Sequence, residues 1–265
     1  MNSVFELASE CLHSSSVDEK LRVTACALAL VEHGPIDYCS KRAPLSISAT
    51  VFPSFPKLVD PAQLPRRGLA SESGRIALLH ALAHIEFYAI QLAWDILYRF
   101  RGLPEPFYKD WLTVAAEEAL HFSMLRARLQ ELGSDYGSLS AHRGLWDVAM
   151  DTADDLLARL ALVPRTLEAR GLDVTPGMIK KLLQVGDSSS AEILKRILHD
   201  EIGHVAIGSK WFKTICEQRG LDPRTTYFDW VQRVLKGKIH GPINHELRRQ
   251  AGFDEHELER LERML

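Results

Sequence analysis

The sequence predicts an all-α protein whose centre is a bundle of four long helices. Apolar residues recur at helical spacing over four long segments, turn residues separate these segments, and the alternation typical of strands is nearly absent. The 265 residues are 46% hydrophobic and 25% charged, which is ordinary for a globular protein. A chain of this length can bury a substantial core without disulfides.

Residues 1–72 are expected to form two helices followed by an extended arm. A short amphipathic stretch runs from Val4 to Leu12, and Ser16 with the two acids after Val17 is typical of the start of a second helix. Six prolines between residues 35 and 65 exclude a long helix there. Because apolar residues accompany the prolines, we expect this arm to pack on the rest of the protein, the alternative being a disordered linker.

The bundle itself is expected to span residues 73–220. Gly133, Gly171 and Gly220 predict the ends of its second, third and fourth helices, because glycine readily adopts the left-handed conformation that follows a helix. Pro164 predicts a kink inside the third helix. The four helices are therefore expected at 74–101, 105–132, 144–171 and 190–219.

The remaining segments are expected to extend the same structural domain. A short extra helix is predicted at 176–185, between the third and fourth helices of the bundle. The last segment, 221–265, is predicted to hold two short helices, at 226–236 and 254–264, around a loop that contains glycine and proline. The sequence thus predicts one domain with helical extensions at both ends.

Composition argues against several classes of protein. The net charge of −3 gives no electrostatic case for nucleic acid as the main partner. The four cysteines form no C-x-x-C pair, which argues against a disulfide framework and against a cysteine-bound metal centre. Neither a secretory leader nor an apolar run of about 18 residues is evident. We therefore expect a cytoplasmic protein with reduced cysteines and no membrane partner.

One motif with the chemistry of a metal ligand pair occurs twice. Glu118 stands three residues before His121, and Glu201 stands three residues before His204. Residues at this spacing share one face of a helix, so that both side chains can reach the same metal ion. A single E-x-x-H is weak evidence, and the case depends on what accompanies each copy.

Each copy has a companion glutamate at nearly the same distance upstream. Glu86 precedes Glu118 by 32 residues, and Glu168 precedes Glu201 by 33. Two helical hairpins that each supply one glutamate and one E-x-x-H form the ligand set of di-iron carboxylate bundles. Glu86 and Glu118 should lie opposite each other, at the same height in their hairpin. Glu168, near the expected end of its helix, fits less well.

Charge balance supports two metal ions. Four buried carboxylates without counter-charge would each cost several kcal/mol or more, whereas two divalent cations neutralise them and leave two neutral histidines. Carboxylate and imidazole ligands without thiolates favour iron or manganese. The expected cofactor is therefore a pair of metal ions, iron first, with manganese or a mixed Mn/Fe pair as the alternative.

Competing interpretations exist for some of these residues. Glu10 with His13 is a third E-x-x-H, but its short segment has no partner helix with a matching glutamate, so we ascribe it to chance. Glu117 could be the inward residue instead of Glu118, but it has no histidine three residues on. The assignment of Glu168 as a ligand depends on its spacing from Glu201 and on its place in an apolar stripe of the helix. The alternative is a surface glutamate near the end of a helix.

Other polar residues on the predicted core helices remain open. His80 and His84 stand one turn apart and could bind a metal, but neither shares a face with Glu86, so a surface or supporting role is favoured. Asp200 is either a surface residue or one that orients a ligand histidine.

These motifs resemble those of the ferritin-like superfamily. More narrowly, they resemble a bacterial ferritin-like family catalogued as a domain of unknown function, over about residues 30–250. The segments that carry the resemblance are 83–86, 116–121, 167–173 and 199–204. The resemblance implies that Glu118 and Glu201 bridge the two metals. The remaining ligands would then complete one metal each, Glu86 with His121 and Glu168 with His204.

The resemblance implies a site but no substrate, because related folds host oxygenases, oxidases, a tRNA-modifying hydroxylase, rubrerythrins and iron-storage proteins. We expect an O2-dependent oxidoreductase or hydroxylase that acts on a small molecule or nucleoside, since the extra segments could wall off a substrate pocket. Its partners would be dioxygen, that substrate and, for an oxygenase, an electron donor. A homodimer is compatible with the sequence.

Three alternatives remain. The protein could bind or handle iron without oxidising a substrate, although a storage cage needs little more than the bundle. It could be a tRNA-modifying hydroxylase, although the pI near 6.4 weakens that version. It could be a scaffold that kept the fold, although a scaffold would be expected to lose ligands and all six positions are occupied.

Overall fold

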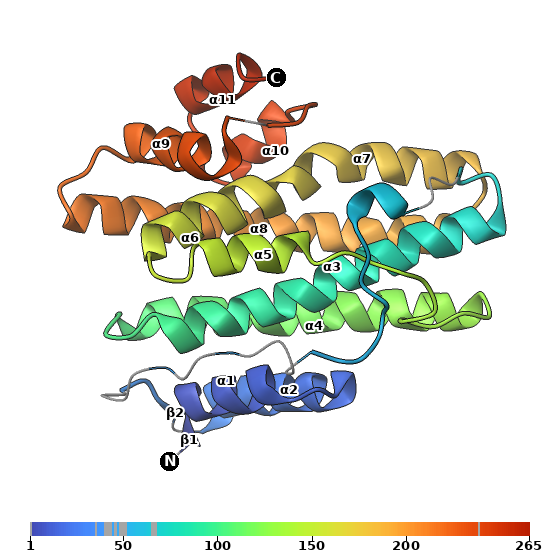
Figure 1. The fold of residues 1–265 in the computed structure, drawn as a ribbon, viewed down its shortest axis with the longest axis horizontal. Coiled ribbons are helices and arrows are strands. Elements are labelled where there is room, and N and C mark those ends of the chain that lie inside the picture. Colours follow the sequence, from blue (N-terminus) through green and yellow to red (C-terminus); the bar gives the residue numbers. More distant parts are fainter. Residues whose placement is uncertain are drawn as a thin grey trace. The chain divides into compact units, whose positions relative to one another are not determined.

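Helices carry nearly all the regular structure of the protein (Figure 1). A computed structural model describes residues 2–34, 36–39, 44, 47, 52–64, 68–237 and 239–265. The chain divides into two compact units, Met1–Arg143 and Gly144–Leu265, and each contains one long helical hairpin. The predicted bundle, 73–220, takes helices from both units. The all-α class is confirmed, while the packing of four helices into one ferritin-like bundle stays a prediction.

The first unit begins with two helices that are capped by serines. They are α1 (Val4–His13) and α2 (Val17–His33), close to where the sequence predicts them. The hydroxyl oxygens of Ser3 and Ser16 accept hydrogen bonds from backbone N–H groups in the first turns. Each cap satisfies a donor that the helix itself leaves unpaired.

The predicted arm is partly described. Two short strands, β1 (Asn2–Ser3) and β2 (Ile36–Asp37), pair in parallel. Further along, the turn of 3-10 helix η2 (Pro61–Gln63) follows a bridge between Leu58 and Ala141, which holds this part of the arm on the loop after the second hairpin helix. Residues 35, 40–43, 45–46, 48–51 and 65–67 of the predicted arm lie outside the described residues.

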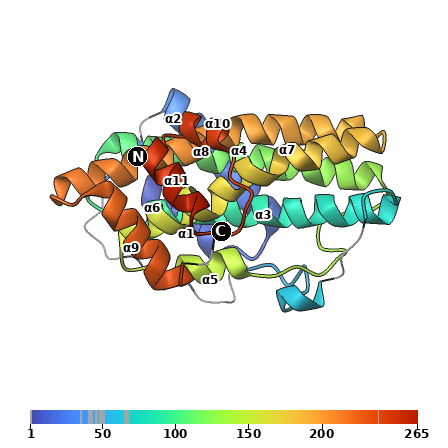
Figure 2. The same cartoon turned by 90° about the horizontal axis from the view of Figure 1, so that it is seen from above.

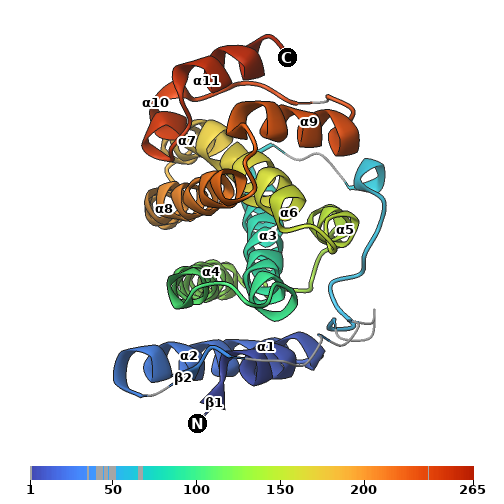
Figure 3. The same cartoon turned by 90° about the vertical axis from the view of Figure 1, so that its left-hand side faces the viewer.

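An antiparallel hairpin forms the core of the first unit. Its helices are α3 (Glu72–Arg99) and α4 (Glu105–Glu131), within two residues of the predicted bounds. Gly102 and Gly133 have φ of 72° and 71°, the left-handed conformation that glycine adopts at low cost, and they lie just after the two helices. Helix α1 packs on α3 and α2 packs on α4 (Figure 3).

Helix α3 corrects one expectation from the sequence. Among the described residues it is the one helix that is long and apolar enough to cross a membrane, although no such run was expected. However, 67% of its most apolar window is buried inside the protein, which is the pattern of a core helix in a globular protein. The helix also buries polar side chains, namely His80, His84, Glu86, Gln91 and Asp95.

The second unit departs most from the prediction, in the third long helix. Instead of one helix over 144–171, the chain forms α5 (Gly144–Asp151), α6 (Leu156–Leu162), the π-helical turn η3 (Val163–Glu168) and α7 (Ala169–Gln184). Pro164 lacks the N–H that an α-helix needs, and the helix widens at this point without ending. Gly171 was wrongly predicted to end the helix, and the predicted helix at 176–185 is the second half of α7.

Helix α8 (Ser188–Gln218) returns antiparallel to α7 (Figure 2). Its predicted end is confirmed by Gly220, which has a φ of 64°. Beyond it, α9 (Pro223–Leu235) packs on α6 and α8, α10 (His245–Gln250) packs on α7 and α8, and α11 (Glu255–Glu262) packs on α10 (Figure 3). The helices predicted at 226–236 and 254–264 are confirmed, whereas α10 is too short to give a periodic signal.

A glycine brings α8 close to the π-helical turn. A Cβ on Gly208 would overlap the ring of Pro164, which is rigid and belongs to η3. Gly203 lies on the same helix, is exposed, and has open space where a Cβ would be. The two glycines therefore differ in the space available, although both are helical.

We predict opposite effects for the same substitution at these two positions. Gly208→Ala should destabilise the protein by about 1–3 kcal/mol because the methyl group cannot be accommodated without moving Pro164. Gly203→Ala should stabilise it by about 0.5–1 kcal/mol because alanine loses less backbone entropy in a helix. Urea unfolding midpoints measure both changes. Equal changes in stability for the two variants would contradict the close packing of α8 on η3.

Candidate metal centre

The first half of the candidate centre lies in the α3–α4 hairpin. Glu86 projects from α3, Glu118 and His121 project from α4, and one ligand atom of each lies within 4.8 Å of the others. Nδ1 of His121 is 3.3 Å from Oε2 of Glu86 and 3.4 Å from Oε2 of Glu118. All three residues are buried. Two carboxylates and an imidazole that converge in the interior suit a divalent cation such as iron or manganese.

Helix geometry accounts for this convergence. Glu118 and His121 share one face of α4 because they stand three residues apart. Glu86 lies 13 residues before the end of α3 at Arg99, and Glu118 lies 13 residues after the start of α4 at Glu105. The two glutamates are therefore at the same height in the hairpin, as the sequence predicts.

The charges of the two carboxylates and the imidazole in this half-site influence one another. Burial raises the pKa of Glu86, and the neighbouring carboxylate of Glu118 raises it further. Burial works against the charged form of His121, but hydrogen bonds and charge from the two glutamates outweigh it and raise the pKa of the imidazole. Both shifts favour protons on these groups, and a divalent cation that bound here would displace them.

Aromatic side chains follow two of these ligands along the chain. Phe87 follows Glu86 in α3, Phe122 follows His121 in α4, and their ring centroids are 5.6 Å apart. The ring of Tyr136 packs against both, with centroids at 5.5 Å and 5.0 Å. All three rings are buried, and they form an apolar cluster one residue on from Glu86 and His121 in the hairpin.

Two histidines near the site hold a loop instead of offering ligand atoms. Nε2 of His84 donates to the backbone carbonyl of His142 at 2.9 Å, so its Nδ1 accepts from the hydroxyl of Tyr136, also at 2.9 Å. Nε2 of His80 accepts from the backbone N–H of Gly137 at 3.0 Å. Burial lowers the pKa of both rings. These contacts agree with the supporting role favoured from the sequence.

The second half of the candidate centre lies in the second unit. Glu201 and His204 share a face of α8, and Nδ1 of His204 is 3.8 Å from Oε2 of Glu201. His204 is buried, and Glu201 is half-buried. Glu168 is the last residue of η3 and is also half-buried.

The continuation of α7 removes the misfit expected for Glu168. This residue lies 16 residues before the end of α7 at Gln184, and Glu201 lies 13 residues after the start of α8 at Ser188. The two glutamates thus stand at similar distances from their turn, as in the first hairpin. Single π-helical turns occur often at functional sites, and sequence reasoning missed this one because Pro164 predicts only a kink.

The residues that competed for a role fall elsewhere. Glu10 forms an ion pair with Arg22 at 2.7 Å on the exposed face of α1, and His13 is exposed. Glu117 is half-buried whereas Glu118 is completely buried, in agreement with Glu118 as the inward residue. Asp200 forms an ion pair with Arg196 at 2.6 Å along α8.

We predict that the three E-x-x-H histidines differ in their effect on metal binding. His121→Ala and His204→Ala should each weaken iron(II) or manganese(II) binding by at least about tenfold, because each removes a buried ligand. His13→Ala should leave the affinity unchanged. Anaerobic equilibrium dialysis with metal analysis measures all three, and equal losses in the three variants would refute the assignment.

Comparison with known proteins gives a family for the chain. An uncharacterized protein of Haemophilus influenzae (strain ATCC 51907 / DSM 11121 / KW20 / Rd) is 46% identical over 215 residues, which cover 78% of this chain and 75% of that protein. No solved structure matches. A family described as "Protein of unknown function (DUF455)" matches residues 13–259, nearly the whole described chain including all six candidate ligands. The chain therefore belongs to the DUF455 family.

Proposed function

We propose that the protein is a di-metal carboxylate protein with a ferritin-like bundle, in which the two half-sites form one centre. The observation that carries this proposal is the repetition of a unit: a glutamate on one helical segment and an E-x-x-H at a similar height on its antiparallel partner, once in α3–α4 and once in η3–α7 with α8. Bundles of this kind hold their metals between two such hairpins.

The six proposed ligands can then be assigned to the two metals. The glutamates of the two E-x-x-H motifs, Glu118 and Glu201, would bridge the two metals. The other four ligands would complete one metal each, Glu86 with His121 and Glu168 with His204. Four carboxylates and two neutral imidazoles balance two divalent cations, and the absence of thiolates from this set favours iron, with manganese or a mixed pair as the alternative.

We further propose an oxidoreductase or hydroxylase that uses dioxygen in the cytoplasm. Two adjacent redox-active ions would supply the electrons that reduce dioxygen. The contribution of the chain would be to fix the ligands and to exclude water. Phe87, Phe122 and Tyr136 favour this use, because a buried aromatic wall protects a reactive site from side reactions. The substrate would be a small molecule or a nucleoside.

Iron handling without substrate oxidation is the main competitor. A storage protein needs a route for many ions and a cage to hold them, whereas this chain devotes α1, α2 and the helices after α8 to packing on its two hairpins. A tRNA-modifying hydroxylase is a narrower version of the proposal, and the net charge of −3 gives it no electrostatic support.

The fate of iron distinguishes these functions. We predict that anaerobic protein loaded with iron(II) consumes dioxygen and retains about two ferric ions per chain, which a reductant returns to the ferrous state. The measurement follows oxygen uptake, bound iron and the optical spectrum over repeated additions of iron. Accumulation of many ferric ions per chain in a retained core would instead establish storage.

A further inference from the structure

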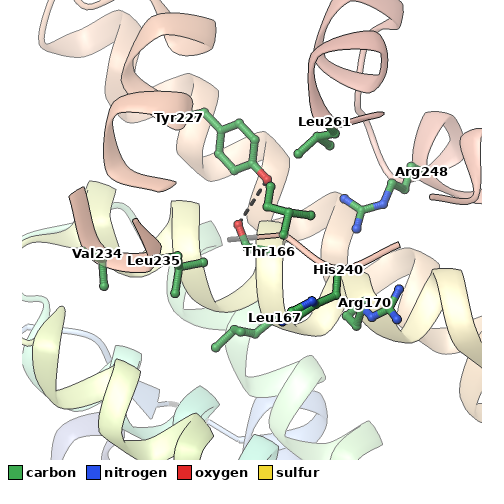
Figure 4. A pocket seen from close by; sticks show the side chains of 10 residues that line it. Thr166, Leu167, Arg170, Tyr227, Val234, Leu235, His240, Arg248 and Leu261 are labelled. Carbon is green, nitrogen blue, oxygen red and sulfur yellow. Dashed lines mark hydrogen bonds between the residues drawn. The ribbon is translucent and has the colours of Figure 1, made fainter. Parts of the chain in front are cut away.

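A cavity of about 460 Å³ lies in the second unit, apart from the ligands described above (Figure 4). Its walls come from η3, α7, α9, α10, α11 and the loop before α10. This volume is in the range of cavities that bind small organic molecules.

The polar part of the wall is cationic. Arg170, Arg248 and His240 line the cavity, and none of the described residues that line it is acidic (Figure 4). Asp173 lies behind the two arginines: it accepts hydrogen bonds from Nε and Nη2 of Arg248 at 2.9 Å and 2.7 Å. It is also 3.8 Å from Nη1 of Arg170. One carboxylate therefore serves two guanidinium groups, which leaves a net positive charge at the wall.

Arg248 is the side chain that makes this wall unusual. It is buried, with 2% of its surface exposed, and its Nη1 is buried without a hydrogen-bond partner. A buried guanidinium N–H that lacks an acceptor costs free energy, and hydrogen bonds from a charged donor are stronger than neutral ones. An oxyanion in the cavity would offset the charge of the wall, and a turn of the Arg248 guanidinium would bring Nη1–H to one of its oxygens.

The rest of the wall is apolar. Thr166 and Tyr227 contribute hydroxyl groups that bond to each other at 3.1 Å, and the other lining side chains are aliphatic. The aliphatic residues are Leu167, Val234, Leu235, Ile239 and Leu261. A ligand that fills this space must therefore carry an apolar body as well as its charged end.

We propose that this cavity binds a small organic anion, with a carboxylate or phosphate head against Arg248 and Arg170 and an apolar body against the aliphatic wall. The guanidinium group fits both heads because its N–H donors match two oxygens in one plane. This inference does not depend on the metal centre, since none of the proposed metal ligands lines the cavity.

Isothermal titration of the full chain with matched probes tests the proposal. Octanoate and octyl phosphate carry the two heads on one body, 1-octanol carries the body alone, and acetate carries a head alone. We expect at least one of the two octyl anions to bind at least about tenfold more tightly than 1-octanol and acetate. The anion that binds more tightly identifies the head. Failure of both at millimolar concentration, or an affinity equal to that of 1-octanol, would overturn the proposal.

A pair of variants locates the binding site. Ile239→Glu places a carboxylate in the cavity wall and should weaken binding of the preferred anion by at least about tenfold. Leu183→Glu makes the same kind of change on α7 outside the cavity, where the side chain is 47% exposed, and should leave binding unchanged. Because Ile239 is half-buried, the variant should fold. The test also leaves the buried Arg248 unaltered. Equal affinities in the two variants would contradict the assignment.

Discussion

The cost of burying carboxylates is the constraint on which this structure depends. Two other buried acids face arginines: Asp95 lies 2.6 Å from Arg99, and Glu257 lies 2.8 Å from Arg165. Glu86 and Glu118 instead approach each other and the imidazole of His121. Two carboxylates that are buried this close together repel each other as anions, which favours a proton or a cation between them. The interior of the α3–α4 hairpin is therefore suited to a metal.

The surrounding structure keeps these ligands in register. Helix α1 packs on α3 and α2 packs on α4, and a buried hydrogen bond of 2.9 Å joins Nε1 of Trp94 to the hydroxyl of Thr24 in α2. On the other side, His80 and His84 hold the loop that carries Tyr136. In the second unit, a glycine lets α8 approach the π-helical turn that ends at Glu168. Each of these contacts holds a helix that bears a candidate ligand.

Much of this arrangement could be predicted from the sequence, because helix caps and apolar periodicity are local signals. Ser16, Gly133 and Gly220 mark element ends where they were expected. The third long helix could not be predicted, because Gly171 and Pro164 are read as an end and a kink, whereas tertiary packing carries the helix through both. That error made Glu168 look misplaced, although its spacing from Glu201 was already informative. The aromatic wall depends on Tyr136, which lies in a loop and gives no periodic signal.

The cationic cavity was also beyond sequence reasoning, because Arg170, His240 and Arg248 come from separate elements and follow no common spacing. The paired glutamates and E-x-x-H motifs, in contrast, repeat along the chain and could be found by inspection. The proposed centre therefore requires that both sets of a glutamate and an E-x-x-H bind one pair of metals.

Spectroscopy of the half-oxidised protein tests that claim most directly. The chain, loaded anaerobically with iron(II) and oxidised by one electron, is expected to hold about two iron ions whose spins are coupled through shared carboxylates. Electron paramagnetic resonance, combined with iron analysis of the same sample, would then show one coupled mixed-valence centre. A single iron ion per chain, or two ions without coupling, would contradict the account.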